Sequence, residues 1–132
     1  AIRYAVFVEE QGIPAELEID DYDPIAEHAL ACVDNQCVAT ARIYLDGHEP
    51  SKAKIGRMAV MREFRGLGIG TALLGESIRA GMMQGASIFE LHAQQSAVPF
   101  YAKLQFKPDG AIFDEVGIPH QCMRLVLGAP AR

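Results

Sequence analysis

With 132 residues, half of them apolar and 22% charged, the chain has the composition of one globular domain, which argues against disorder. The formal net charge of −5 argues against a nucleic-acid partner, because nucleic-acid binding requires a basic surface. No apolar run approaches the roughly 20 residues that span a bilayer, so no membrane partner is expected. We therefore expect residues 1–132 to form a single domain.

The first 24 residues are expected to form a short amphipathic helix followed by an acidic segment. Residues 1–11 have apolar side chains at helical spacing, and Gly12-Ile13-Pro14 ends the helix. A solvated loop is the usual interpretation of the acidic run that follows, and a loop that holds a cationic substrate is the alternative. The acidic residues of this run are Glu16, Glu18, Asp20, Asp21 and Asp23.

Two strands, residues 27–33 and 36–45, are expected on either side of an Asp34-Asn35 turn. In that register Glu27 lies opposite Arg42, which predicts a cross-strand ion pair. His28 would then be a half-buried structural residue. After a polar turn over residues 46–54, a third strand is expected at residues 55–60.

Three cysteines occur, at positions 32, 37 and 122. Their spacing fits no metal site, and no secretory signal is visible, so we expect no metal and a reducing, cytoplasmic location. Cys32 and Cys37 flank the Asp34-Asn35 turn, where a hairpin would bring the two thiols within disulfide reach. The simpler interpretation is two small buried thiols.

Residues 55–83 have the pattern of a strand, a glycine-rich turn and a helix. Gly66, Gly68 and Gly70 leave the backbone N–H groups bare where the helix begins. The first N–H groups of a helix have no partners within the helix, and the helix dipole adds positive charge there, so such a turn binds phosphate. Arg65 adds a guanidinium that can bind phosphate oxygens in a bidentate manner.

The rest of the chain alternates helices and strands. The helix after the glycines is expected to end near Gly85 and to be followed by a strand at residues 87–94, parallel to the strand before the glycines. A short helix over residues 96–104 and a closing strand over 121–127 complete the pattern. The side chains expected to pack the glycine helix on the sheet are Leu74, Ile78 and Met82, flanked by Ile69 and Leu73.

A glycine-rich turn between a strand and a helix has three interpretations. A Walker loop requires a lysine before Ser or Thr, but here Gly70 is followed directly by Thr71. A dinucleotide fingerprint requires a third glycine three residues after the second, whereas these glycines fall at positions 66, 68 and 70. Both interpretations fail on spacing.

The third interpretation rests on resemblance. The segment Arg65-Gly66-Leu67-Gly68-Ile69-Gly70 resembles the Arg/Gln-x-x-Gly-x-Gly/Ala signature of the GNAT superfamily of acyl-CoA-dependent N-acetyltransferases. Residues 97–106, AVPFYAKLQF, resemble the family's A-x-x-F-Y-x-x-x-G-F helix and strand. The resemblance covers nearly the whole chain, and the opening residues are similar to a subgroup of small bacterial members.

This resemblance implies an α+β fold: a mixed, mostly antiparallel sheet with two central splayed parallel strands, flanked by helices. The family's first strand would lie upstream of Ala1. Gln105 stands where the family has glycine, which affects the local turn. Gln94 stands where many members have an asparagine that contacts the cofactor. An exposed edge near the C-terminal strands leaves a homodimer open.

The resemblance also implies acetyl-CoA as co-substrate and a cofactor site with two parts. The backbone of Met58, Ala59 and Val60 would pair with the pantetheine arm, and Gln94 would be a further contact. A backbone N–H near Val60 could also stabilise the oxyanion. The pyrophosphate would be held by the turn that comprises Arg65, Gly66, Leu67, Gly68, Ile69, Gly70 and Thr71.

The implied reaction moves an acetyl group to a primary amine of a small molecule or peptide by direct attack in a ternary complex. Tyr101 matches the family tyrosine that protonates the departing thiolate. Glu90 and His92 share one face of their strand, and either could accept the proton of the substrate ammonium. His120 is a third candidate, and Glu115 beside it is interpreted as a loop charge.

Two other functions stay open at this point. One is a non-catalytic acyl-CoA-binding regulatory module that keeps the fold without the chemistry. The other is acyl-homoserine-lactone synthesis, because the FVEEQ…DDYD opening faintly resembles those synthases. The chain contains no tryptophan, however, and it retains the glycine turn that those synthases lack.

Overall fold

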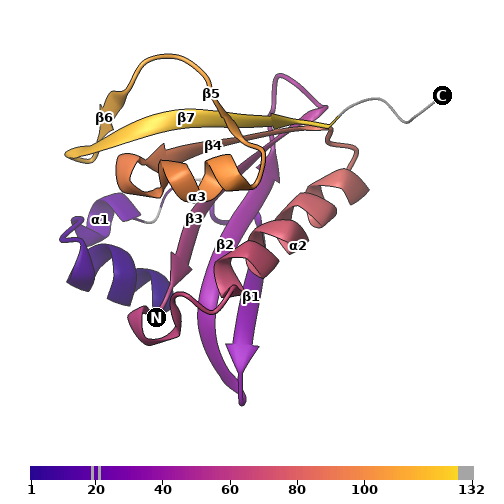
Figure 1. Ribbon diagram of the computed structural model, residues 1–132. Helices are drawn as coiled ribbons and strands as arrows, with labels where there is room; N and C mark the ends of the chain where they lie inside the picture. Colours follow the sequence, from indigo (N-terminus) through magenta and orange to yellow (C-terminus); the bar gives the residue numbers. More distant parts are fainter. Residues whose placement is uncertain (19, 21, 128–132) are drawn as a thin grey trace.

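The computed structural model describes residues 1–18, 20 and 22–127 (Figure 1). Its strands form one sheet in the order β1-β2-β3-β4-β7-β5, with β6 paired to β7. Only β3 and β4 pair in parallel among the described strands, so the expected mixed α+β sheet is confirmed. The strands are β1 (Glu27–Val33), β2 (Gln36–Leu45), β3 (Lys52–Val60), β4 (Ile88–Gln94), β5 (Lys107–Pro108), β6 (Phe113–Glu115) and β7 (Ile118–Val126).

The helices flank this sheet. α2 and α3 pack in the main core, where Leu74 and Tyr101 meet Phe89 of β4. The N-terminal segment packs separately, with Phe7 against Ala59 of β3. No helix among the described residues is long and apolar enough to cross a membrane. The helical segments are η1 (Tyr4–Glu10, a π-helix), α1 (Ala15–Glu18), η2 (Arg62–Phe64), α2 (Ile69–Met83), η3 (Gln95–Ala97) and α3 (Val98–Lys103).

The β1–β2 hairpin turns at Asp34-Asn35, as expected, and both turn residues have positive φ. An irregularity in the pairing next to Cys32 shifts the register by one residue, so Arg42 lies opposite His28. The predicted ion pair between Glu27 and Arg42 is therefore wrong. His28 is exposed rather than half-buried, and its Nε2 contacts the backbone oxygen of Asp23.

Cys32 and Cys37 lie directly opposite each other on the two strands. Their sulfur atoms are 2.6 Å apart. Both residues are exposed, so the interpretation as buried thiols is wrong. The turn geometry places the pair at the solvent-facing end of the hairpin, where a small oxidant can reach it.

β3 and β4 separate along their length. They pair over Lys52–Ile55 and Ile88–Leu91 only, and beyond Ile55 the next part of β3 pairs with β2 alone. At the point of separation β3 bulges, because Arg57 adopts φ +49° and the register with β2 shifts there. The expectation of two splayed central strands is therefore confirmed (Figure 1).

α2 covers the sheet with most of the expected face, since Leu73 and Leu74 are buried and Ile69 and Ile78 pack against the core. Its buried residues are Leu73, Leu74, Ser77 and Gly81, whereas Met82 is 52% exposed, so its place in the predicted stripe is wrong. A Cβ built on Gly81 would lie 2.5 Å from a ring carbon of Phe89. The glycine therefore allows the end of α2 to approach the sheet more closely than any other residue would.

The C-terminal part follows the prediction with two differences. α3 has a proline in its first turn, as expected. β7 begins at Ile118, three residues before the predicted start, and pairs with the unpredicted strand β6. Gln105, at the position of the family glycine, has φ +76°. The predicted tail at residues 128–132 lies outside the described residues.

Candidate active site

A cleft of about 970 Å³ opens where β3 and β4 separate. Of the residues predicted for the site, all but Leu67 line it; Leu67 is 68% exposed and lies outside the lining. Residues far apart in the sequence therefore share one space. The predicted residues that line it are Met58, Ala59, Val60, Arg65, Gly66, Gly68, Ile69, Gly70, Thr71, Glu90, His92, Gln94 and Tyr101.

The three glycines of the turn have two different roles. Gly66 and Gly68 have φ of +80° and +82°, a conformation that L side chains rarely adopt. Gly68 is the N-cap of α2, and no side chain caps that end, so the first N–H groups of the helix remain open towards the cleft. Gly70 is helical, and a Cβ there would lie 3.4 Å from the Phe100 ring. That distance is at the limit of ordinary van der Waals contact, so the first turn of α2 lies directly against the Phe100 ring at this position.

Arg65 is engaged by the protein itself. Its Nη1 and Nη2 each donate to a different carboxylate oxygen of Glu10 at 2.7 Å, and its Nε donates to the backbone oxygen of Val60 at 2.9 Å. The hydrogen bonds from Arg65 lower the pKa of Glu10. A phosphate would have to share or replace this pair, so the phosphate contact of Arg65 stays a prediction. The observed bonds tie the N-terminal segment to the glycine turn.

Tyr101 reaches from α3 across the splayed strands. Its hydroxyl lies 3.6 Å from Sδ of Met58 on β3, and its ring packs edge-to-face on Phe100 and Phe106. Burial raises the pKa of Tyr101 to about 12, so the hydroxyl keeps its proton at neutral pH. The thioether is a weak acceptor, which leaves the hydroxyl available to a better one.

Glu90 is buried and held by two cations. Arg124 donates to its carboxylate at 2.9 Å, and Nζ of Lys52 lies 3.5 Å away. Burial raises the pKa of Glu90, but the hydrogen bond from Arg124 and the charge of Lys52 outweigh it, so the pKa is lowered. Glu90 is therefore a poor proton acceptor. Ligand atoms of Glu90, His92 and Cys122 lie within 4.8 Å of one another, but the two cations already neutralise the carboxylate that would attract a metal ion.

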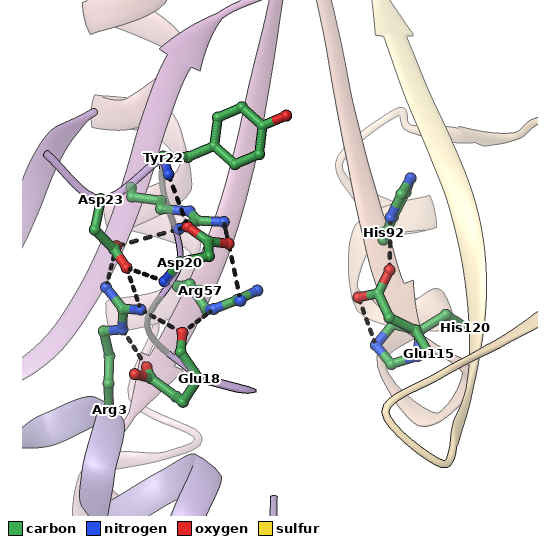
Figure 2. Close-up of polar contacts among 10 residues, drawn as sticks. Arg3, Glu18, Asp20, Tyr22, Asp23, Arg57, His92, Glu115 and His120 are labelled. Carbon is green, nitrogen blue, oxygen red and sulfur yellow. Dashed lines mark hydrogen bonds and ion pairs between the residues drawn. The ribbon is translucent and has the colours of Figure 1, made fainter. Parts of the chain in front are cut away.

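His92 belongs to a chain of three side chains (Figure 2). Its Nδ1 lies 3.0 Å from Glu115 Oε1, and Glu115 Oε2 lies 3.7 Å from Nε2 of the buried His120. A carboxylate only accepts hydrogen bonds, so Nδ1 of His92 is the donor, and in the neutral imidazole the lone pair lies on Nε2. The hydrogen bond from His92 lowers the pKa of Glu115. Nδ1 of His120 donates to the Ile118 backbone oxygen at 2.7 Å.

Sequence reasoning missed Glu115, which it interpreted as a loop charge. Glu115 ends β6 and pairs with Ile118 across Val116-Gly117, two turn residues with positive φ. This short hairpin places the carboxylate beside His92 on β4. The glycine at position 117 was the available signal, because such two-residue turns favour glycine.

The acidic run is neither a solvated loop nor a free negative surface. Glu18, Asp20 and Asp23 are described, and each accepts hydrogen bonds from arginine side chains, so the interpretation as a solvated loop is wrong for these three. A contact of this segment with a cationic substrate stays a prediction. Arg42 Nη1 donates to Asp20 Oδ1 at 2.5 Å and to Asp23 Oδ1 at 3.1 Å. Burial raises the pKa of Asp23, but hydrogen bonds outweigh it and hold the pKa far below its usual range.

Arg3 and Arg57 complete this cluster. Arg3 binds Glu18 and donates to Asp23 at 2.6 Å, and Arg57 donates to Asp20 at 3.2 Å. Three arginines therefore neutralise three carboxylates. Glu16 is exposed, and position 21 lies outside the described residues.

Gln94 contacts the N-terminal segment. Its Nε2 donates to Oε1 of Gln11 at 2.7 Å, although the two residues are 83 positions apart in the sequence. The amide that would replace the family asparagine thus connects β4 to the end of the first helical segment. Its contact with a cofactor stays a prediction.

Comparison with known proteins agrees with this architecture. The family model described as "Acetyltransferase (GNAT) domain" matches residues 5–127. A Bacillus subtilis protein that is provisionally named an acetyltransferase is 38% identical over 125 residues, which are 92% of this chain and 83% of that protein. The crystal structure of an acyl-CoA N-acyltransferase from Pseudomonas aeruginosa is similar with a TM-score of 0.82 and 28% identity, over 93% of this chain and 84% of the other.

An acyl-homoserine lactone synthase, BjaI, shares the fold alone. Its structure with SAM and isopentyl-CoA gives a TM-score of 0.78 at 17% identity, over 96% of this chain and 72% of that one. The family model and the relative at 38% identity carry the assignment. This chain belongs to the GNAT family of acetyltransferases.

Proposed function

We propose that this chain is an N-acetyltransferase that moves an acetyl group from acetyl-CoA to a primary amine by direct attack in a ternary complex. One observation carries the proposal: a single cleft joins an uncapped helix N-terminus to the buried Tyr101 hydroxyl and to His92. The helix N-terminus binds phosphate, the Tyr101 hydroxyl supplies a proton to the leaving thiolate, and His92 removes a proton from the amine. The acceptor is a small molecule or a peptide end.

The cofactor lies along the splayed part of β3. Its pyrophosphate binds the N–H groups at Gly66 to Thr71, and its pantetheine arm follows the part of β3 beyond Ile55, which β4 leaves unpaired. A backbone N–H near Val60 stabilises the oxyanion of the tetrahedral intermediate. This course brings the thioester towards Met58, whose sulfur contacts the Tyr101 hydroxyl.

We assign the base to His92 rather than to Glu90, because two cations hold Glu90. Nε2 of His92 takes a proton from the ammonium directly or through water, and Glu115 stabilises the resulting imidazolium. The amine nitrogen then forms a bond to the acetyl carbon as the carbon–sulfur bond breaks. Tyr101 gives its proton to the thiolate and is reprotonated by the proton that leaves the attacking nitrogen, so one proton is released overall.

A CoA-release assay over a panel of amines tests this proposal. We expect turnover with some amines, and we expect His92→Ala to lower kcat by roughly 100-fold, the usual effect of losing a general base. His48→Ala is the matched control, because His48 is exposed and lies outside the lining of the cleft. Saturable acetyl-CoA binding without turnover on any amine would instead indicate a non-catalytic module. The cytoplasmic location and the homodimer stay predictions.

A further inference from the structure

The part of the cleft away from the glycine turn has two unlike walls (Figure 2). Tyr22 and Arg57 lie on one side, and His92 and Glu115 lie on the other. All four line the same cleft. An acceptor bound between them therefore contacts a guanidinium at one end and the proposed base at the other. This inference rests on the proposed transferase function.

Among its described residues, the first wall carries balanced charge. Glu18, Asp20 and Asp23 are all bound to arginines, and the three positive charges cancel the three negative ones. Both carboxylate oxygens of Asp20 and of Asp23 already accept hydrogen bonds, which leaves these two groups little capacity to bind a further cation. The acidic run in the sequence is thus a scaffold that fixes arginine side chains.

Arg57 is the donor best placed to bind an anion. Its Nε donates to the Glu18 backbone oxygen at 2.9 Å and its Nη2 to Asp20 at 3.2 Å, while its Nη1 has no hydrogen-bond partner within the described part of the chain. The side chain is 25% exposed, and the bulge that carries it lies where the strands separate. Two contacts thus fix the guanidinium and leave a pair of N–H donors facing the cleft, which suits a carboxylate.

A flat aromatic surface lies beside this donor. The rings of Tyr22 and Tyr44 stack with centroids 4.6 Å apart, and the Arg42 guanidinium lies 5.6 Å from the centre of the Tyr44 ring. Both tyrosines line the cleft. They offer apolar contact to the carbon skeleton of a small molecule whose charged end binds Arg57.

Both walls line one cleft, so a single acceptor bound in it can contact both. The charge of Arg57 contributes to lowering the pKa of Glu115 across the cleft, although the hydrogen bond from His92 is the largest cause. We propose that the acceptor is an amino acid-type zwitterion, with its carboxylate on Arg57 and its amino group facing His92. An amine without an anionic group leaves the Arg57 donors unpaired.

Matched pairs of acceptors test this proposal: an amino acid and its carboxamide, such as phenylalanine and phenylalaninamide. Amidation lowers the pKa of the amino group, so more of the amide than of the acid has an unprotonated, reactive amine at neutral pH. Without an anion site, the amide would therefore be the better acceptor. We expect kcat/KM to be higher for the acid by roughly 10-fold to 100-fold, the range for one charge-assisted hydrogen-bond pair. Arg57→Gln should abolish that preference and leave the KM for acetyl-CoA unchanged.

Arg79→Gln is the control, because Arg79 pairs with Glu76 on the exposed side of α2. Equal kcat/KM for the acid and the amide, or a preference that survives Arg57→Gln, would overturn the proposal. Calorimetry that measures binding of the acid and of the amide to the CoA-saturated protein separates the proposed transferase function from the proposed anion site at Arg57. If no amine is acetylated, the proposed function fails, and tighter binding of the acid that is lost in Arg57→Gln still supports the anion site.

Discussion

Two glycines in one helix should respond to alanine in opposite ways. In α2, alanine at Gly75 meets no atom within 4 Å, so the higher helix propensity of alanine should stabilise the fold by about 0.8 kcal/mol. Alanine at Gly81 gains the same propensity. Its Cβ, however, would lie 2.5 Å from Phe89 and 2.9 Å from Ile43, both of which are buried.

Relieving those contacts requires the helix end or the Phe89 ring to move by about 1 Å, an overpacking that costs about 1–3 kcal/mol. The net effect of Gly81→Ala is then a loss of about 0.2–2 kcal/mol in the free energy of unfolding. For a domain of this size, each kcal/mol corresponds to about 3–5 °C in Tm. Gly75→Ala should therefore raise Tm by a few degrees, and Gly81→Ala should lower it.

Differential scanning calorimetry of both variants beside the parent chain measures this difference. A rise in Tm for Gly81→Ala equal to that for Gly75→Ala would refute the close packing of α2 on β4. Gly81 lies near the C-terminal end of the same helix that begins at the glycine turn. A loss of stability at Gly81 alone would therefore support the frame on which the site is built.

Three further predictions follow from the site and the hairpin. Tyr101→Phe should lower kcat by about 10-fold to 100-fold with little change in acetyl-CoA affinity. Steady-state or stopped-flow kinetics measures kcat, and calorimetry measures the affinity. Equal losses in kcat and in affinity would contradict the role of Tyr101 as the acid. Hydrogen bonds from arginines lower the pKa of Asp20, and at Asp23 hydrogen bonds outweigh burial and lower the pKa as well. Ionised Asp20 and Asp23 therefore stabilise the folded state at neutral pH. This stabilisation is lost as the pH falls below the pKa of about 3.9 that an aspartate has in the unfolded chain. Asp23→Asn should flatten the acid branch of a stability curve measured by denaturant titration, and an unchanged curve would contradict the cluster. Thiol exchange with glutathione disulfide should convert Cys32 and Cys37 to an intramolecular disulfide, which mass spectrometry detects as a loss of about 2 Da. Serine in place of Cys32 or Cys37 should prevent this loss, and serine in place of Cys122 should not.

The sequence was sufficient to predict the structure wherever a few neighbouring residues determine the backbone geometry. The Asp34-Asn35 turn, the glycine turn and the proline in the first turn of α3 all specify backbone conformations that few other sequences favour. The splayed strands followed from the family resemblance. The bulge at Arg57 that accompanies the separation had no visible signal, because nothing about an arginine in a strand indicates φ +49°.

Several of the failures depend on contacts between distant segments. The irregularity beside Cys32 shifted Arg42 by one position, which removed its pairing with Glu27. Arg42 then pairs with Asp20, 22 residues away, and no local pattern predicts that distance. Glu115 escaped notice because its partner His92 lies 23 positions earlier on β4, although Gly117 signalled the local hairpin that carries Glu115.

The central claim is that the open N–H groups at residues 66–71 bind the diphosphate of acetyl-CoA. A crystal structure of the complex tests it most directly. The account predicts phosphate oxygens within hydrogen-bond distance of those amides and the thioester beside Met58, within reach of the Tyr101 hydroxyl. Cofactor density elsewhere on the molecule, with the glycine turn empty, would contradict it.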